Sequence, residues 1–189
     1  MADLSFETLK FYDKGEYIKV VFLRNYEFNI KRDVLEKIGP VSVNENTISF
    51  KEVPESKAEK KFMFFLTNGF KELKNIFTGN KTIYIHKNSG IPLIGTRFIG
   101  IHDRGSTLLE IKPLTGCNAN CTFCSVDEGK DSKKKYDFIV EKDYLVEETT
   151  KLLKYKDKEG IHIYINPHGE PLLYYDIVEL VKDLKKIKY

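Results

Sequence analysis

The expected order of strands and helices over residues 107–187 constrains the fold most. TLLEIKP at 107–113 has the apolar alternation of a short strand, and IHIYIN at 161–166 is rich in β-branched and aromatic residues, as strands are. Apolar residues at helical spacing predict helices over 142–156 and 174–187. Strand, loop, helix, strand, helix makes two βα units, so the sequence predicts an α/β domain with a parallel sheet.

Both predicted helices are amphipathic. The buried face of the first is expected to hold Leu145, Thr149, Leu152 and Leu153. The buried face of the second is expected to hold Ile177, Leu180, Val181 and Leu184. Asp143 is expected to cap the first helix, and the polar stretch GKDSKKKYDF at 129–138 to form the long loop that precedes it.

Two loops follow the carboxyl ends of the predicted strands, where α/β proteins place their functional residues. The first loop carries all three cysteines of the chain, Cys117, Cys121 and Cys124, at the spacing C-x3-C-x2-C. The second loop has the sequence NPHGEPLL at 166–173 and begins at the last residue of the second predicted strand. Any chemistry of this domain is therefore expected on these two loops.

Three clustered cysteines leave several alternatives open. A disulfide would leave one cysteine over, and clustered cysteines in a reducing compartment more often bind metal or do redox chemistry. A structural zinc site needs four ligands, so His102 or His168 would have to supply the fourth. Iron-sulfur clusters that only transfer electrons normally use four thiolates. Three thiolates would bind three irons of a [4Fe-4S] cluster and leave the fourth iron open for substrate chemistry.

The segment CNANCTFC, with an aromatic residue directly before its last cysteine, resembles the signature of the radical S-adenosylmethionine (SAM) superfamily. The resemblance implies that Cys117, Cys121 and Cys124 ligate a [4Fe-4S] cluster and that Phe123 packs near the adenine of SAM. It further implies that SAM chelates the open iron and that an electron from the cluster cleaves it. The resulting 5'-deoxyadenosyl radical would then abstract a hydrogen from the substrate.

The second loop is similar to the Gly-Gly-Glu motif with which this superfamily binds the amino group of SAM. Gly169 and Glu170 match its last two positions, and His168 stands where the family usually has the first glycine. Taken alone, Glu170 would be a carboxylate at a helix N-terminus, where the helix dipole favours it. GIPLIGT, DRG and CSVDEG are similar to an uncharacterised archaeal-type group of radical SAM proteins, and this finer likeness implies no particular reaction.

The resemblance implies a partial (β/α)6 TIM-like barrel, of which residues 107–189 provide the first two βα units, because each unit takes roughly 30 residues or more. We therefore expect a truncated or split reading frame, or a barrel that a second chain completes. Two units would leave an open hydrophobic sheet edge. Such a chain is expected to hold a cluster and to cleave SAM poorly.

Residues 1–87 are expected to form a small α+β domain, joined to the barrel part (107–189) by a Gly-rich linker at 88–106. Strands are expected at 16–24, within 40–50 on both sides of an Asn-Glu-Asn turn, and at 81–87, with helices at 31–39 and 56–77. This βαββαβ order matches a ferredoxin-like arrangement. The aromatic residues of the longer helix are expected to belong to the core rather than to a binding surface.

Each of two polar segments near the cysteine loop could be an ordinary solvent-exposed segment or part of a functional surface. His102, Asp103 and Arg104 are expected to form a solvated turn, the alternative being a polar cluster at the site entrance. Residues 133–135, Lys-Lys-Lys, are expected in a solvated loop, the alternative being a docking surface for an acidic reductant such as a ferredoxin or flavodoxin.

Composition limits the classes of partner. The chain has 31 basic and 28 acidic residues, a net charge of +3, and only four arginines, so no nucleic-acid partner is indicated. No run of 18 apolar residues and no signal peptide is present, so no membrane association is indicated and a cytoplasmic location is expected.

These observations favour a radical SAM enzyme whose substrate is unknown. One alternative is a non-catalytic iron-sulfur or zinc module that binds a partner protein. Another gives the first domain a role in recognising a peptide or RNA substrate, although its charge pattern does not favour RNA.

Overall fold

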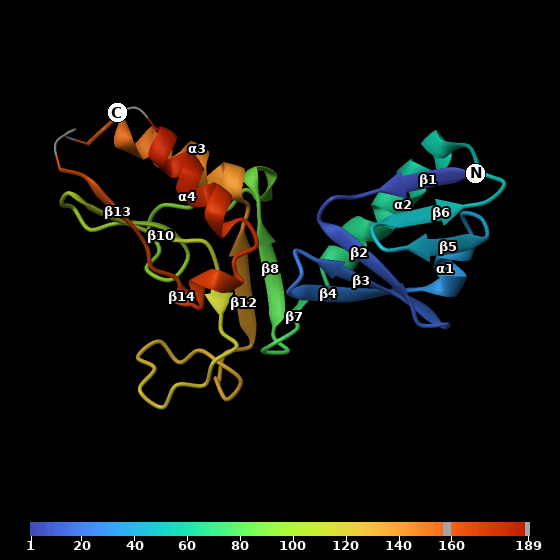
Figure 1. Cartoon of the computed structure of the whole chain (residues 1–189), viewed down its shortest axis with the longest axis horizontal. Helices are drawn as coiled ribbons and strands as arrows, with labels where there is room; N and C mark the ends of the chain where they lie inside the picture. Colours follow the sequence, from blue (N-terminus) through green and yellow to red (C-terminus); the bar gives the residue numbers. More distant parts are fainter. Residues whose placement is uncertain (157–159, 188–189) are drawn as a thin grey trace. The chain divides into compact units, whose positions relative to one another are not determined.

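The computed structural model describes residues 1–156 and 160–187. The chain divides into two compact units, Met1–Lys81 and Thr82–Tyr189, and both mix helices with several sheets (Figure 1). The boundary falls within the strand expected at 81–87, and the segment 88–106 lies inside the second unit.

The first unit has two antiparallel sheets. One has the strand order β1-β6-β5, and in the other β2, β3 and β4 form a meander with β7 beside β4. Its strands are β1 (Ala2–Ser5), β2 (Leu9–Asp13), β3 (Tyr17–Phe22), β4 (Tyr26–Lys31), β5 (Val41–Asn44), β6 (Thr47–Phe50) and β7 (Lys74–Asn75). Its helices are α1 (Arg32–Glu36) and α2 (Glu55–Phe70).

The core of this unit is built around α2. The fully buried ring of Phe62 lies with its centroid 5.8 to 6.0 Å from the rings of Phe6, Phe11 and Phe50. Leu66, one turn further along, is also buried, so the expectation that this helix faces the core is confirmed for these two residues. The helix ends at Phe70, which leaves Phe77 beyond it and partly exposed.

The expected βαββαβ order is wrong for this unit, because β1, β2 and β4 all precede the first helix. The paired strands around the Asn-Glu-Asn turn, β5 and β6, are confirmed. The continuation of the meander from β3 to β4 was missed because the turn between them lacks the usual signals. Between β3 and β4 the chain turns through Leu23 and Arg24 at φ 47° and 65°, a left-handed conformation that Gly and Asn normally supply.

The described part of the second unit contains four further pairings of strands. Their strands are β8 (Lys81–Ile85), β9 (Gly100–Asp103), β10 (Leu108–Lys112), β11 (Thr115–Gly116), β12 (Tyr136–Val140), β13 (His162–Ile165) and β14 (His168–Gly169). Its helices are α3 (Lys142–Leu153) and α4 (Ile177–Lys186), with single 3-10 turns at Lys87–Ser89 and Pro171–Leu173. The sheets have the orders β13-β10-β9 and β11-β14, and β12 lies beside β8.

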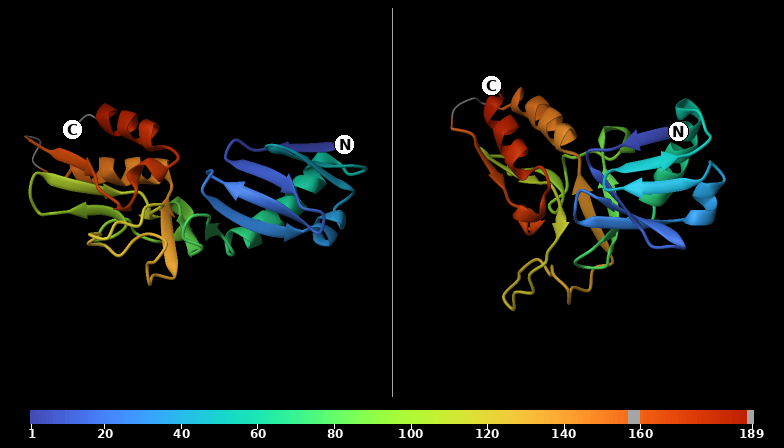
Figure 2. Two further views of the ribbon diagram at one scale, coloured as in Figure 1. Left: turned by 60° about the horizontal axis from the view of Figure 1, so that its bottom comes forward. Right: turned by 45° about the vertical axis from the view of Figure 1, so that its right-hand side comes forward.

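The parallel sheet expected from the two βα units is confirmed. Strand β10 pairs in parallel with β13, in a register that runs from Leu108 opposite His162 to Ile111 opposite Ile165. Helices α3 and α4 lie side by side (Figures 1 and 2), and Lys142 Nζ reaches Asp183 Oδ2 at 2.6 Å. The two helices therefore cover the parallel pair together, as in other α/β units.

Three details of this unit differ from the expectations. The stretch 129–138 is not all loop, because β12 begins at Tyr136 and buries Ile139 and Val140. Strand β9, antiparallel to β10, lies in the segment expected to be a linker, where glycines conceal its short apolar run. Asp143 does not cap α3, since it lies in the first helical turn, where it pairs with Lys142.

Candidate functional site

The short parallel pair of β11 and β14 brings the cysteine loop and the HGEP loop together. Thr115 lies opposite His168, and Gly116 opposite Gly169. The backbone N–H of Glu170 then donates to the Gly116 carbonyl at 3.3 Å. A Cβ at position 169 would lie 2.2 Å from that carbonyl oxygen, so this close approach requires glycine. The two loops that the sequence singles out are therefore neighbours at one end of the parallel strands.

The cysteine sulfurs lie on one loop without being gathered around a common point. All three thiols are free, with Cys117 half-buried and Cys121 and Cys124 exposed. Within residues 1–156 and 160–187, no three His, Cys, Asp or Glu side chains are arranged to hold a metal ion. The sulfur of Cys117 accepts the Ala119 N–H at 3.3 Å, and the Cys124 N–H donates to the Cys121 carbonyl at 3.1 Å.

The surroundings of Cys124 favour a thiolate. Hydrogen bonds from the backbone N–H groups of Glu128 and Val126 lower the pKa of Cys124, and they outweigh its slight burial and the charge of Glu128. Thiolate is the form that ligates iron, and N–H groups aimed at the sulfurs are the usual surroundings of iron-sulfur clusters. The donor set, three accessible cysteines on one loop with one thiolate stabilised, fits the ligation of such a cluster.

Glu128 ties the end of the cysteine loop back to its start. Its carboxylate is buried, accepts the Gly116 N–H at 3.1 Å and forms an ion pair with Lys134. Burial raises the pKa of Glu128, and the hydrogen bond and charge of Lys134 oppose that rise. Lys134 also donates to the Val126 carbonyl at 2.7 Å. The solvated-loop expectation is therefore wrong for Lys134, whereas Lys133 and Lys135 are exposed.

The remaining residues of the two predicted motifs have individual surroundings. Phe123 is 86% exposed on the cysteine loop. Glu170 Oε1 accepts the Leu172 N–H at 2.9 Å at the start of the 3-10 turn, so its expected place at a helical N-terminus is confirmed. His168 is half-buried, and burial, together with the charges of Lys112 and Lys134, lowers its pKa.

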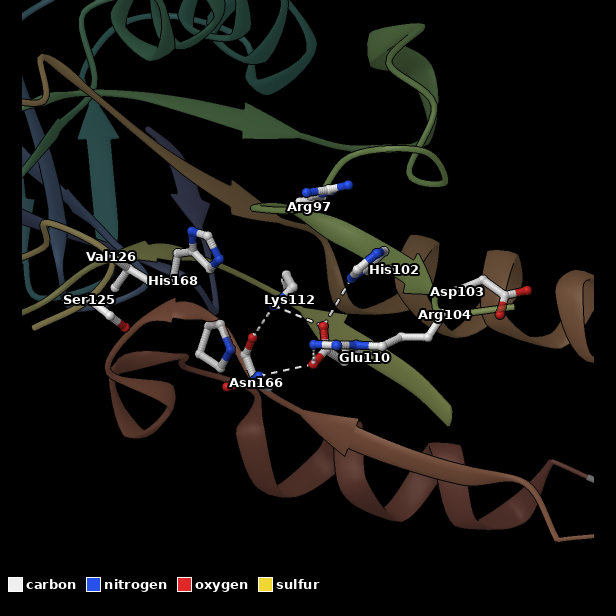
Figure 3. A pocket seen from close by; sticks show the side chains of 11 residues that line it. Arg97, His102, Asp103, Arg104, Glu110, Lys112, Ser125, Val126, Asn166 and His168 are labelled. Carbon is white, nitrogen blue, oxygen red and sulfur yellow. Dashed lines mark hydrogen bonds and ion pairs between the residues drawn. The ribbon is translucent and has the colours of Figure 1, made fainter. Parts of the chain in front are cut away.

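A cavity of about 660 Å³ adjoins the HGEP loop and the carboxyl ends of the parallel strands (Figure 3). At its centre lies the buried carboxylate of Glu110, which has donors on both oxygens. Its Oε2 lies 3.0 Å from His102 Nδ1 and 3.4 Å from Lys112 Nζ. Its Oε1 accepts from Arg104 Nη2 at 2.7 Å and from Asn166 Nδ2 at 3.2 Å. The lining residues are Arg97, His102, Asp103, Arg104, Glu110, Lys112, Ser125, Val126, Asn166, Pro167 and His168.

This network corrects the expectation for the segment 102–104. His102 and Arg104 bind Glu110, and Asp103 pairs with Lys156 at 2.6 Å, so the segment is a polar cluster and not a solvated turn. Burial alone would raise the pKa of Glu110, but the hydrogen bonds from Arg104, His102 and Asn166 bring it down to about 2. Glu110 and Lys112 were missed as site residues. Their signal was two charges at alternate positions of an otherwise apolar strand.

Comparison with known proteins agrees with this geometry. Residues 111–189 match the family model of the Radical SAM superfamily. The resemblance predicted from CNANCTFC is thereby confirmed over that part of the chain, which begins near the end of β10.

The chain is also similar in sequence to an uncharacterized protein of Methanocaldococcus jannaschii. The two are 44% identical over 116 residues, which is 61% of this chain and 26% of that protein. The chain thus spans about a quarter of the length of that curated relative. The archaeal source of that relative agrees with the archaeal-type group suggested by GIPLIGT, DRG and CSVDEG. No solved structure matches the chain. No helix in the described part of the chain is long and apolar enough to cross a membrane.

Proposed function

We propose that this chain carries the cofactor-binding part of a radical SAM enzyme. Cys117, Cys121 and Cys124 would ligate three irons of a [4Fe-4S] cluster, and the loop of Gly169 and Glu170 would bind SAM beside it. The observation that carries the proposal is the pairing of β11 with β14, which sets the C-x3-C-x2-C loop next to the HGEP loop.

The chain's own residues would bind and orient the two cofactors. When bound, the cluster and SAM supply one-electron reductive cleavage of a carbon-sulfur bond. The N–H groups around Cys124 would stabilise its thiolate as a ligand, and the Glu128 carboxylate holds the loop that carries it. Glu170 has one carboxylate oxygen committed to Leu172, and the other is available to the SAM amino group. Phe123, exposed and apolar, would cover the adenine.

The proposal includes two kinds of partner. An electron donor of the ferredoxin or flavodoxin type would reduce the cluster. Further βα units of a partial barrel, whether from this protein or from a second chain, would continue the sheet beyond β13. Strand β13 is the last in its sheet in the described structure, and an apolar groove of about 340 Å³ runs along it. The groove is lined mainly by Ile161, Ile163, Ile165, Val181, Leu184 and Ile187.

The test is anaerobic reconstitution with iron and sulfide. We expect each of the variants Cys117→Ala, Cys121→Ala and Cys124→Ala to lose the absorbance of a [4Fe-4S] cluster, while Thr122→Ala, within the same loop, keeps it. Adding SAM to the reduced, reconstituted chain should change its electron paramagnetic resonance spectrum. A cluster or zinc site that forms without all three cysteines, or that is indifferent to SAM, would instead support a non-catalytic metal-binding module.

A further inference from the structure

The cavity beside the HGEP loop carries an excess of positive charge. Arg97, Arg104 and Lys112 line it, and Glu110 is the acid that faces them. The other acidic residue of the lining, Asp103, is neutralised by Lys156 at 2.6 Å. Three cations in this cavity therefore have one carboxylate to balance their charge.

Glu110 cannot balance these charges alone. Both of its oxygens are already occupied, by His102 and Lys112 on one side and by Arg104 and Asn166 on the other. Lys112 is only 3% exposed, and its ammonium also donates to the carbonyl of Asn166 at 2.7 Å. Two cations thus share one buried carboxylate. A buried charge without full compensation is costly, which favours an anion entering from the cavity.

Two further side chains face the cavity with donors to spare. Neither Arg97 nor the imidazole of His168 makes a hydrogen bond or ion pair to a side chain or backbone group in the described residues. Figure 3 shows Arg97 and His168 apart from each other, with Lys112 below both and His102 on the far side of Arg97 from His168. A planar guanidinium matches the two oxygens of a carboxylate or phosphate, which makes Arg97 the best placed residue for such a group.

We propose that this cavity binds a carboxylate or phosphate group of the substrate, through Arg97 with Lys112, Arg104 and His168 around it. The proposal rests on the proposed radical SAM function, because it takes the cavity next to the SAM loop to be the substrate site. Its volume of about 660 Å³ accommodates a molecule larger than a single anionic group. The anionic group would anchor the substrate at the floor of the site and leave the rest of it directed toward the cysteine loop.

The test measures anion binding separately from cofactor binding. The chain without cluster is titrated with inorganic phosphate and, separately, with succinate, at about 10 mM ionic strength so that screening is weak. Calorimetry gives the affinity, and nitrogen-15 spectra of the histidine rings report on His102 and His168. Arg97→Gln should weaken binding by roughly 10- to 100-fold, the usual effect of a hydrogen bond to a charged group. Lys133→Gln removes an exposed cation outside the cavity and should leave the affinity unchanged.

The outcomes separate this proposal from the function on which it rests. Preferential binding of phosphate or of succinate identifies the substrate group and supports the proposal. Equal affinities for wild type and Arg97→Gln, or histidine spectra unmoved by both anions, would overturn it. So would stoichiometric release of the bound anion by SAM from the reconstituted chain, because the site would then belong to the SAM carboxylate. Cluster assembly is read independently from its absorbance, so its loss would count against the proposed function alone.

Discussion

The two units of the molecule bury different kinds of side chain. The core of Met1–Lys81 is aromatic and aliphatic, with Phe62 packed among other phenylalanine rings. In Thr82–Tyr189 the buried side chains include Glu110, Lys112, Glu128 and Asp137. Every buried charged side chain in the described residues lies in this second unit. Burying a charge rarely adds stability compared with apolar packing. The difference therefore indicates that the second unit is arranged for binding and the first for stability.

The largest expected effect tests the apolar core of the first unit. Phe62→Ala removes a fully buried ring from the first unit, and we expect it to lower the free energy of unfolding by about 3 to 5 kcal/mol. Phe64→Ala, in the same helix but 64% exposed, should change it by less than about 0.5 kcal/mol. Urea denaturation followed by circular dichroism measures both. Similar losses for the two variants would show that this unit does not depend on a closed aromatic core.

The second largest expected effect tests the buried charged residues of the second unit. Glu110→Gln leaves Lys112 and Arg104 without a buried counter-charge, so we expect a loss of about 3 kcal/mol at neutral pH. The pKa of Glu110 is about 2 in the folded chain against 4.5 for a free glutamate, so its contribution is complete above about pH 5. It is lost as the pH falls from 4.5 through 2. The stability difference between wild type and Glu110→Gln should therefore shrink over that range.

The control for this pH effect is Glu59→Gln, which removes an exposed carboxylate from α2. Its stability should follow that of the wild type at every pH to within about 0.5 kcal/mol. Urea midpoints measured between pH 2 and pH 7 are the measurement. A Glu110→Gln variant as stable as the wild type at pH 7 would mean that the buried charges of the second unit have no specific partner.

A smaller effect tests the junction of the two loops. Gly169→Ala places a methyl group against the Gly116 carbonyl, so β11 and β14 must separate, at about 1 to 3 kcal/mol. Amide exchange at Glu170, which donates to Gly116, should accelerate in this variant. Leu172→Ala, three residues on and highly exposed, serves as the control. Unchanged exchange at Glu170 in Gly169→Ala would show that the loop contact does not depend on glycine.

Sequence reasoning succeeded where periodicity carried the signal. The parallel pair of 107–113 with 161–166 and the buried leucines of α3, Leu145 and Leu153, follow from strand alternation and helical spacing. It failed where left-handed turn positions are occupied by residues other than Gly or Asn, as at Leu23 and Arg24. The strand β12 was missed because lysines precede it directly and concealed its apolar end.

The residues of the candidate site likewise fall into those that the sequence predicted and those that it did not. The cysteine and HGEP loops were found because each follows a predicted strand, and the structure pairs Gly116 with Gly169. The partners of these loops were not found, because a contact such as Glu128 to Gly116 joins positions that no periodicity connects. Glu110 had a signal in the sequence, because it is a charged residue inside an apolar strand. Its four donors, however, come from segments that only the folded chain brings together.

The hydrogen bond from the Gly116 N–H to the Glu128 carboxylate closes the cysteine loop into a ring in the folded chain. A ring of this size has far fewer conformations than an open segment, so the chain entropy that three ligands would lose on binding is already reduced in the folded protein. Gathering the three thiols then becomes a local rearrangement within a short tether. If the chain binds the proposed cluster, folding of the second unit would in this respect be the first step of its assembly.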